Sequence, residues 1–225
     1  SVSHDLRTPL TALRAGLGML EAQQTETSRP DVQRLWNNAR RNVERLGIFI
    51  DDLLALNQLK AGTLQLNREP LDVRDVVSNA LASVYVLIQK KNQVLDVDLP
   101  VPLLINADPW RMEQVIVNVL ANAHRHTPAA TTIGIAGHCA DSSVLLTVRD
   151  DGPGIPTEEL KAIFERFHRG PSHESGSGLG LAIAKAIVEL HGGSMWAESE
   201  MGAGATFYIK LPSLPDREEH HGEAH

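Results

Sequence analysis

Apolar side chains recur at helical spacing over the first sixty residues of the chain. Intervals of three and four residues predict an amphipathic helix that starts at or before Val2 and fades near Glu21–Gln24. After a turn at "TETSRP", a second stripe predicts a helix from a cap at Asp31 to about Leu59. The first stripe is Val2, Leu6, Leu10, Leu13, Leu17 and Leu20; the second is Val32, Leu35, Ala39, Val43, Leu46, Ile50 and Leu53.

The two predicted helices would form a hairpin that exposes one apolar stripe on each helix. A helix of thirty residues is about 45 Å long, and no third helix of that length follows nearby in the sequence. We therefore expect two copies of the hairpin to pair as a dimeric four-helix bundle. Packing of the hairpin on the rest of the same chain is the alternative. Because the helical pattern is already under way at Val2, we also expect a further segment upstream.

Beyond Gly62 the pattern changes to short strands and helices in irregular alternation. Helices are expected over 72–91, 108–126 and 179–190. Their order favours a mixed or antiparallel sheet with helices on one face, an α+β fold, over a doubly wound parallel sheet. The expected strands are "TLQLN" (63–67), "VLDVDL" (94–99), "PLLINA" (102–107), "TTIGIAGH" (131–138), "VLLTVRD" (144–150), "GSMWAESE" (193–200) and "ATFYIKL" (205–211).

Composition then narrows the class of protein. A chain of 225 residues with 42% hydrophobic content can bury a core, and its net charge of −7 lacks the basic footprint of a nucleic-acid binder. The single cysteine, Cys139, excludes an internal disulfide and favours a reducing compartment. The sequence has no apolar run of about 18 residues, so this part of the protein is not expected to span a membrane.

The segment "DPWRMEQVIVNVLANAHRHTP" (108–128) has an unusual polar face. Asp108 as cap and Pro109 in the first turn would start its helix. Asparagine is a mediocre helix former, yet two asparagines stand one turn apart, and their amide oxygens suit a hard cation such as Mg²⁺. An ordinary solvent-facing stripe is the alternative. The buried face would hold Val115, Ile116, Val119, Leu120 and Ala123, and the polar face Arg111, Gln114, Asn118, Asn122 and Arg125, with His126 beside it.

A carboxylate ends one predicted strand. In "VRDDGPGIP" (148–156), Asp150 closes the strand, and Gly152 and Gly154 bracket a tight turn. Such a carboxylate, beside backbone without side chains, can accept a hydrogen bond from the amine of a flat ring. A plain surface turn is the alternative, because Asp-Gly is common in turns.

A glycine cluster stands directly before the last predicted helix. Gly176, Gly178 and Gly180 open the segment "GSGLGLAIAKAIVELHGG" (176–193). Glycines let backbone amides approach phosphate oxygens, and the start of a helix adds partial positive charge. The spacing matches neither the Walker pattern nor the dinucleotide fingerprint.

Taken in order, these segments resemble the histidine protein kinases of two-component signalling, over nearly the whole chain. The resemblance implies a dimerisation and histidine-phosphotransfer hairpin over 1–62, an ATP-binding domain of the Bergerat, or GHKL, fold over 63–214, and a disordered acidic tail over 215–225. The similar motifs are the H box "SHDLRTPL" (3–10), the N box "NVLANAHRHTP" (118–128), the first glycine box "DDGPGI" (150–155), the F box "FERFHRG" (164–170), the second glycine box "GSGLGLAI" (176–183) and the closing strand "GAGATFYIKLP" (202–212).

The resemblance also implies ATP and Mg²⁺ as cofactors and assigns roles to residues. Asn122 would bind Mg²⁺, Asp150 would accept from the adenine amino group, and His126 would border the nucleotide. Phe164 and Phe167 would anchor a mobile lid, with core positions as the alternative for both. The remaining implied nucleotide-binding residues are Asn118 and Arg125 near the phosphates, Gly152 and Gly154 at the adenine, and Gly176, Gly178, Leu179 and Gly180 at the phosphate side.

By the same resemblance, His4 accepts the phosphoryl group, Asp5 orients its ring, and Thr8 supports phosphatase activity. Pro9 costs a helix roughly 3 kcal/mol, and the bend would loosen the helix beside His4. For Thr8, a hydrogen bond to its own helix backbone is the alternative. The implied partners are a response-regulator receiver domain, whose aspartate takes the phosphoryl group, and a second copy of the chain. The implied location is the cytoplasmic portion of a protein anchored at the bacterial inner membrane.

Two other classes share parts of this pattern. The GHKL ATPases of the gyrase, mismatch-repair and heat-shock-chaperone type resemble the second domain, but they place a glutamate one turn before the metal asparagine as a base for water. That position is Asn118 here. A non-catalytic dimer that merely binds nucleotide is the other alternative, and the complete set of motifs disfavours it.

Overall fold

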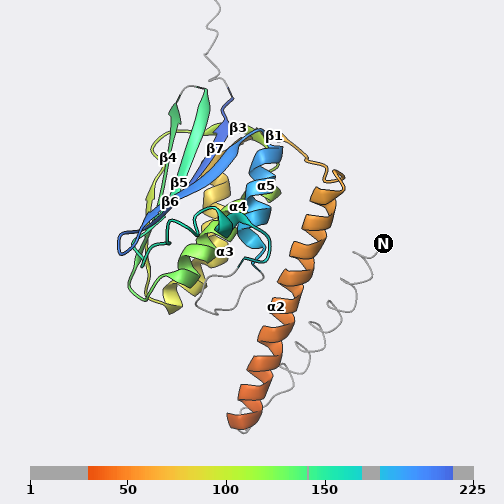
Figure 1. Cartoon of the computed structure of the whole chain (residues 1–225), viewed down its shortest axis with the longest axis vertical. Helices are drawn as coiled ribbons and strands as arrows, with labels where there is room; N and C mark the ends of the chain where they lie inside the picture. The colour runs from red at the N-terminus through yellow and green to blue at the C-terminus, as the bar shows by residue number, and fades with distance from the viewer. Residues whose placement is uncertain (1–29, 141, 169–177, 215–225) are drawn as a thin grey trace, which may run out of the picture. The chain divides into compact units, whose positions relative to one another are not determined.

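The chain folds into two compact units, Ser1–Leu64 and Gln65–His225, in the computed structural model (Figure 1). The structure describes residues 30–140, 142–168 and 178–214. The first predicted helix, with its H-box residues, therefore lies outside the described residues, as do Gly176 and the tail. The second predicted helix is present as α2 (Pro30–Lys60).

Helix α2 begins one residue before the predicted cap. Pro30 is already helical, so the prediction of Asp31 as the cap is wrong. Proline fits the first turn of a helix, where its missing N–H would have no partner in any case. Along the predicted apolar stripe, Leu46 is 48% exposed, and Ile50 and Leu53 are half-buried.

The segment "TLQLN" forms no strand, contrary to the prediction. The first strand is β1 (Glu69–Asp72), which pairs antiparallel with β3 (Leu104–Ala107). Two residues before β1 are bonded to other segments. The backbone N–H of Asn67 donates to Asp108 Oδ2 at 3.0 Å, and the side-chain guanidinium of Arg68 donates to the Leu190 carbonyl. A segment with an alternating pattern forms a strand only where another strand is available to pair with it.

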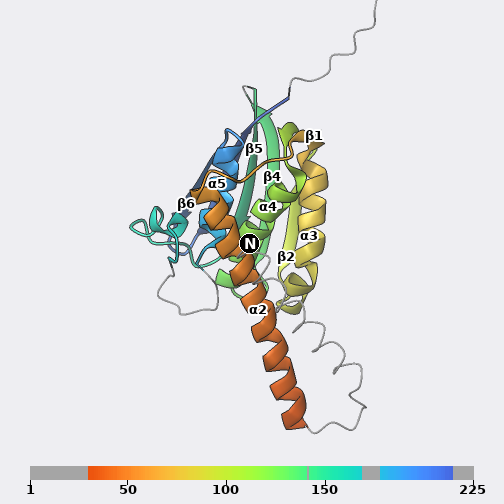
Figure 2. The ribbon, with the colours of Figure 1, turned by 90° about the vertical axis from the view of Figure 1, so that its right-hand side faces the viewer.

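The second unit contains a five-stranded sheet beside the β1–β3 pair, and the sheet is mixed, one of the two arrangements predicted. β2 runs parallel to β4, and the other neighbouring strands are antiparallel. Three helices cover one face of this sheet in both views (Figures 1 and 2). The sheet order is β2 (Val94–Asp98), β4 (Thr132–Ala140), β5 (Ser143–Asp150), β7 (Gly204–Pro212) and β6 (Ser194–Glu200); the helices are α3 (Val73–Lys90), α4 (Pro109–His126) and α5 (Gly180–Leu190), with a short 3₁₀ helix η1 (Ala162–Phe164).

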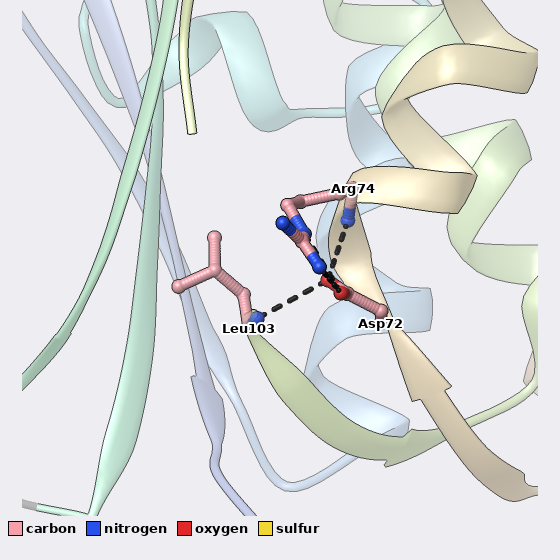
Figure 3. Close-up of polar contacts among 3 residues, drawn as sticks. All are labelled: Asp72, Arg74 and Leu103. Carbon is pink, nitrogen blue, oxygen red and sulfur yellow. Dashed lines mark hydrogen bonds and ion pairs between the residues drawn. The ribbon is translucent and has the colours of Figure 1, made fainter. Parts of the chain in front are cut away.

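Asp72 starts α3, as the sequence predicts. Its carboxylate accepts from the Arg74 N–H at 3.0 Å and from the Leu103 N–H at 3.1 Å, and it forms an ion pair with the Arg74 guanidinium (Figure 3). Burial alone would raise the pKa of Asp72, but the hydrogen bonds from Arg74 and Leu103 outweigh it and hold the pKa below its ordinary value. The cap therefore ties the start of α3 to the backbone just before β3.

The core lies between the helices and the covered face of the sheet. The predicted buried face of α4 is buried, with Met112 in addition. Successive side chains of a strand point to opposite faces, and the inward series on β5 is Val144, Leu146, Val148 and Asp150. The last inward position of β5 thus carries a carboxylate to the face that the helices cover.

Candidate functional site

The polar face of α4 is not an ordinary solvent-facing stripe. Asp108 caps the helix by accepting from the Arg111 N–H at 3.0 Å, as predicted. Asn118, Asn122 and Arg125 on this face are all half-buried rather than exposed. The helix therefore presents two amide side chains, one turn apart, in partly enclosed surroundings.

Asn118 joins α4 to the first turn of α5. Its Nδ2 donates to the Gly180 carbonyl at 3.0 Å. A Cβ at position 180 would lie 3.4 Å from both Cγ and Oδ1 of Asn118, which is ordinary van der Waals contact, so position 180 packs directly against the Asn118 side chain. The contact brings the N box and the second glycine box together and leaves Asn118 Oδ1 for other partners.

The Asn122 side chain fits a hard cation. It is half-buried, and its amide makes no hydrogen bond to another of the residues that the structure describes. An amide oxygen is a ligand that Mg²⁺ accepts, together with water and phosphate oxygens. His126 lies about two helical turns after Asn118. It is exposed, and it interacts with another group of the protein.

Asp150 is a buried carboxylate held by the turn that follows it. Only 6% of the residue is exposed, and its Oδ1 accepts from the Gly152 N–H at 3.0 Å. Burial raises the pKa of Asp150, while hydrogen bonds from the backbone of Gly152 and Ala205 offset part of that rise. A buried carboxylate gains from each further donor, so an N–H from a ligand would stabilise its charged form.

The turn after Asp150 is packed on both sides. A Cβ on Gly152 would lie 2.6 Å from Thr127 Cγ2, at the end of α4. Gly154 has φ +80°, a left-handed conformation that favours glycine, and a Cβ there would collide with the Glu200 carbonyl. Gly152 and Gly154 therefore shape a tight connection between α4 and the β6–β7 hairpin, which excludes the plain surface turn.

The second glycine box meets the end of the F box. The Phe167 N–H donates to the Gly178 carbonyl at 2.8 Å, and a Cβ on Gly178 would lie 2.7 Å from the His168 carbonyl oxygen. Leu179 is fully buried at the cap position of α5, and Gly180 is the first helical residue. The first N–H groups of a helix have no partner within it, so this end of α5 can bind an anion beside Asn118.

The two F-box phenylalanines have different surroundings. Phe164 is half-buried and packs edge-to-face on Phe207, with 6.4 Å between ring centroids and the Lys185 ammonium over its face. Phe167 is 58% exposed, with φ of 62°. The alternative that Phe167 occupies a core position is therefore wrong.

Two buried polar residues beside this site were not among the predicted site residues. Thr127, the cap after α4, touches the Gly152 turn, and its place directly after the N-box helix was a usable signal. Gln93 is 4% exposed and donates to Thr127 Oγ1 at 2.7 Å. It is the last of five consecutive polar residues (89–93) before a strand, and no spacing or motif distinguished it from the others.

Comparison with known proteins matches both parts of the chain. Residues 107–215 match the family described as histidine kinase-, DNA gyrase B-, and HSP90-like ATPase. Residues 1–62 match the His Kinase A (phospho-acceptor) domain. The two matches together define a phosphoacceptor domain joined to an ATPase-type domain.

Individual proteins that are similar to this chain belong to the same class. The chain is 36% identical over 221 residues to the adaptive-response sensory kinase SasA of Thermosynechococcus vestitus (strain NIES-2133 / IAM M-273 / BP-1), covering 94% of this chain and 58% of SasA. Full-length ShkA, solved in complex with AMPPNP, has a TM-score of 0.79 at 26% identity over 94% of this chain and 44% of that chain. The mycobacterial sensor histidine kinase MprB has a TM-score of 0.59 at 31% identity over 66% of this chain and 99% of that chain.

The chain belongs to the sensor histidine kinases, which confirms the resemblance seen in its motifs and the predicted Bergerat fold. It spans 58% of the length of the SasA relative. Within the described ranges, no helix is long and apolar enough to cross a membrane.

Proposed function

We propose that this chain binds ATP and Mg²⁺, transfers the γ-phosphoryl group to His4, and passes it to an aspartate of a response-regulator receiver domain. The observation that carries the proposal is Asp150, a buried carboxylate at the covered end of β5 that is held by Gly152. Its surroundings suit the recognition of an adenine amine. ShkA, a relative of similar fold, was solved with AMPPNP, which supports ATP as the nucleotide.

At the adenine end, Asp150 would accept from the exocyclic amine. Gly152 and Gly154 let the turn after Asp150 pack closely against Thr127 and the Glu200 carbonyl, because a Cβ on either glycine would collide with these atoms. A buried acceptor without its donor costs about 1–3 kcal/mol. The site would therefore favour a base that carries an amino group at this position.

At the phosphate end, the start of α5 and the polar face of α4 would both contact the negatively charged phosphates of the nucleotide. Asn118 is tied to the Gly180 carbonyl at 3.0 Å, which keeps the two helices together. Arg125 would approach the phosphates and His126 would border the nucleotide, as the family resemblance implies. Asn122 would hold Mg²⁺, which neutralises negative charge on the phosphate oxygens when it is bound.

The transfer needs positioning more than covalent help from the protein. A neutral imidazole has a reference pKa of about 6.5 and is a competent nucleophile at cellular pH. In the proposed step, Asp5 accepts a hydrogen bond from one ring N–H of His4. The lone pair of the other ring nitrogen forms the N–P bond, the bond from phosphorus to the β–γ bridging oxygen breaks, and ADP leaves with that electron pair.

The family resemblance also suggests where the reaction takes place. We infer that the full-length protein is anchored at the bacterial inner membrane and that this portion faces the cytoplasm, where ATP and the receiver domain are available. Incubation of the chain with Mg²⁺ and γ-labelled ATP tests the proposed transfer. The chain is expected to become labelled, and a chain that binds ATP without taking up label would contradict the proposal.

Hydrolysis of ATP by a gyrase-type mechanism is disfavoured by the structure around Asn118. The related ATPases have a glutamate at this position as the base for water. Here the amide nitrogen of Asn118 donates to the Gly180 carbonyl, and an amide cannot take a proton from water at neutral pH. Transfer to a histidine does not require that base.

We further propose that two copies pair through the hairpin, because the apolar stripe of α2 stays partly open at Leu46. Leu46→Glu is expected to convert a dimer into a monomer, since burying an unpaired charge costs several kcal/mol. Sedimentation velocity of the full chain measures the change. Asn37→Glu is the matched control: Asn37 is exposed and lies half a turn around the helix from Leu46. A monomeric wild-type chain, or a Leu46→Glu variant that stays dimeric, would refute the bundle.

Thr8 would orient the water that removes phosphate from the regulator. It lies four residues after His4, so the two side chains share one face of the predicted helix. Thr8→Ala is expected to keep autophosphorylation but to slow dephosphorylation of the phosphorylated receiver domain, whereas Thr8→Asn retains it. The rate of phosphate release from purified phospho-receiver is the measurement. An unchanged rate in Thr8→Ala would leave Thr8 with a purely structural role.

A further inference from the structure

Gln93 lies in a buried polar cluster at the end of α4. Its Nε2 donates to Thr127 Oγ1 at 2.7 Å, to the Pro128 carbonyl at 3.1 Å and to the His124 carbonyl at 3.4 Å. Its Oε1 lies 2.6 Å from His124 Nδ1. An amide oxygen only accepts, so Nδ1 of His124 carries the proton in this contact. One side chain thus contacts three residues at the point where α4 ends.

These contacts hold the last turn of α4 in one arrangement. Thr127 Oγ1 donates to the Ala123 carbonyl at 2.8 Å while it accepts from Gln93, so both functions of the hydroxyl are used. Lys91 Nζ donates to the His124 carbonyl at 2.8 Å. The carbonyls at a helix end lack partners within the helix, and here Lys91 and Gln93 supply them from the segment between α3 and β2.

The cluster connects directly to the turn that holds Asp150. With its hydroxyl engaged, Thr127 presents its methyl group to the turn, where Cγ2 would lie 2.6 Å from a Cβ on Gly152. The Gly152 N–H in turn donates to Asp150 Oδ1 at 3.0 Å. Three successive contacts therefore lead from Gln93 through Thr127 and Gly152 to the buried carboxylate.

We propose that Gln93 is a positioning residue for nucleotide binding, acting through Thr127 and Gly152 on the orientation of Asp150. The proposal rests on the proposed role of Asp150 in holding adenine. Gln93 is 4% exposed and makes its side-chain contacts to the end of α4, so it acts through these residues and not by touching the nucleotide.

Gln93→Glu tests this role with almost no change in side-chain volume. A carboxylate oxygen would replace the donating nitrogen and would face the hydroxyl and carbonyl oxygens of the cluster. We expect ADP to bind about tenfold more weakly, the size of effect that follows from losing a hydrogen bond to a buried group. Isothermal titration calorimetry with ADP on the full chain measures it. Gln89→Glu, with the same change of charge at an exposed position of α3, is expected to bind ADP like the wild type.

A double-mutant cycle separates positioning from general destabilisation. In the Asp150→Asn background, Gln93→Glu is expected to weaken ADP binding by less than twofold, because the side chain that Gln93 positions no longer offers a carboxylate to the adenine amine. Additive losses, with the full tenfold effect in both backgrounds, would overturn the proposal. Wild-type affinity for ADP in the Gln93→Glu single variant would overturn it as well.

A second variant covers poor folding of Gln93→Glu. Gln93→Met keeps an unbranched side chain of similar length without adding a charge, and it removes the donor to Thr127. It is expected to show the same loss of ADP affinity and the same absence of further loss in Asp150→Asn, and additive losses would overturn the proposal here too. If the wild type fails to bind ADP, the proposed function fails first; if Asp150→Asn loses affinity and neither Gln93 variant does, only the positioning role fails.

Discussion

Replacing His4 by glutamine is expected to abolish the transfer of phosphate from ATP to the chain and to leave nucleotide binding unchanged. The lone pair of a glutamine amide nitrogen is delocalised onto the carbonyl, so the side chain keeps a polar group of similar reach but loses the nucleophile. Uptake of label from γ-labelled ATP measures the transfer, and titration with ADP measures binding.

Another histidine provides the control for the His4 variant. His138 is exposed on β4 and outside the proposed site, so His138→Gln is expected to take up label like the wild type. Label retained by His4→Gln would identify a different acceptor and would remove the assignment of the H box. Loss of ADP binding in His4→Gln would show that the substitution damages the ATP-binding unit.

Asp150→Asn is expected to weaken binding of both ADP and free adenosine by about 5- to 150-fold, which corresponds to about 1–3 kcal/mol for an unpaired buried group. Asparagine keeps an oxygen for the Gly152 N–H, whereas alanine would remove that acceptor as well. The amide nitrogen would then face the adenine amine, donor against donor. Calorimetric titration with each ligand, with and without Mg²⁺, measures the effect.

Asn122→Ala provides the contrasting pattern. If Asn122 holds the metal, the loss of affinity is expected for ATP in the presence of Mg²⁺ and not for free adenosine. Asp98→Asn is the charge control for Asp150→Asn, because Asp98 is exposed on β2 and outside the proposed site. Identical patterns for Asp150→Asn and Asn122→Ala would contradict the separate base and metal positions.

Local signals were sufficient to predict α4 and the position of Asp150. The cap at Asp108, the proline after it and the apolar spacing determine where α4 starts and which face is buried. On β5, two-residue alternation places Asp150 on the covered face at the end of the strand. These features depend on contacts between near neighbours in sequence, which a pattern can represent.

The pattern of hydrophobic and polar residues could not predict contacts between segments that are distant in the sequence. The segment "TLQLN" has the alternating pattern of a strand, but it pairs with no strand among the described residues. The Asn67 N–H instead donates to the Asp108 carboxylate. Gln93 shows no periodicity, and its importance comes from meeting Thr127 at the far end of α4. The packing of Thr127 on Gly152 likewise depends on how the helix end meets the sheet.

The chemical stability of the label tests the central claim most directly. Wild-type chain is incubated with Mg²⁺ and either γ-labelled or α-labelled ATP, and the labelled protein is then treated with acid or alkali. A phosphohistidine at His4 predicts label from γ-labelled ATP alone, lost in acid and retained in alkali. Label that survives acid, or that comes from α-labelled ATP, would contradict phosphoryl transfer to His4.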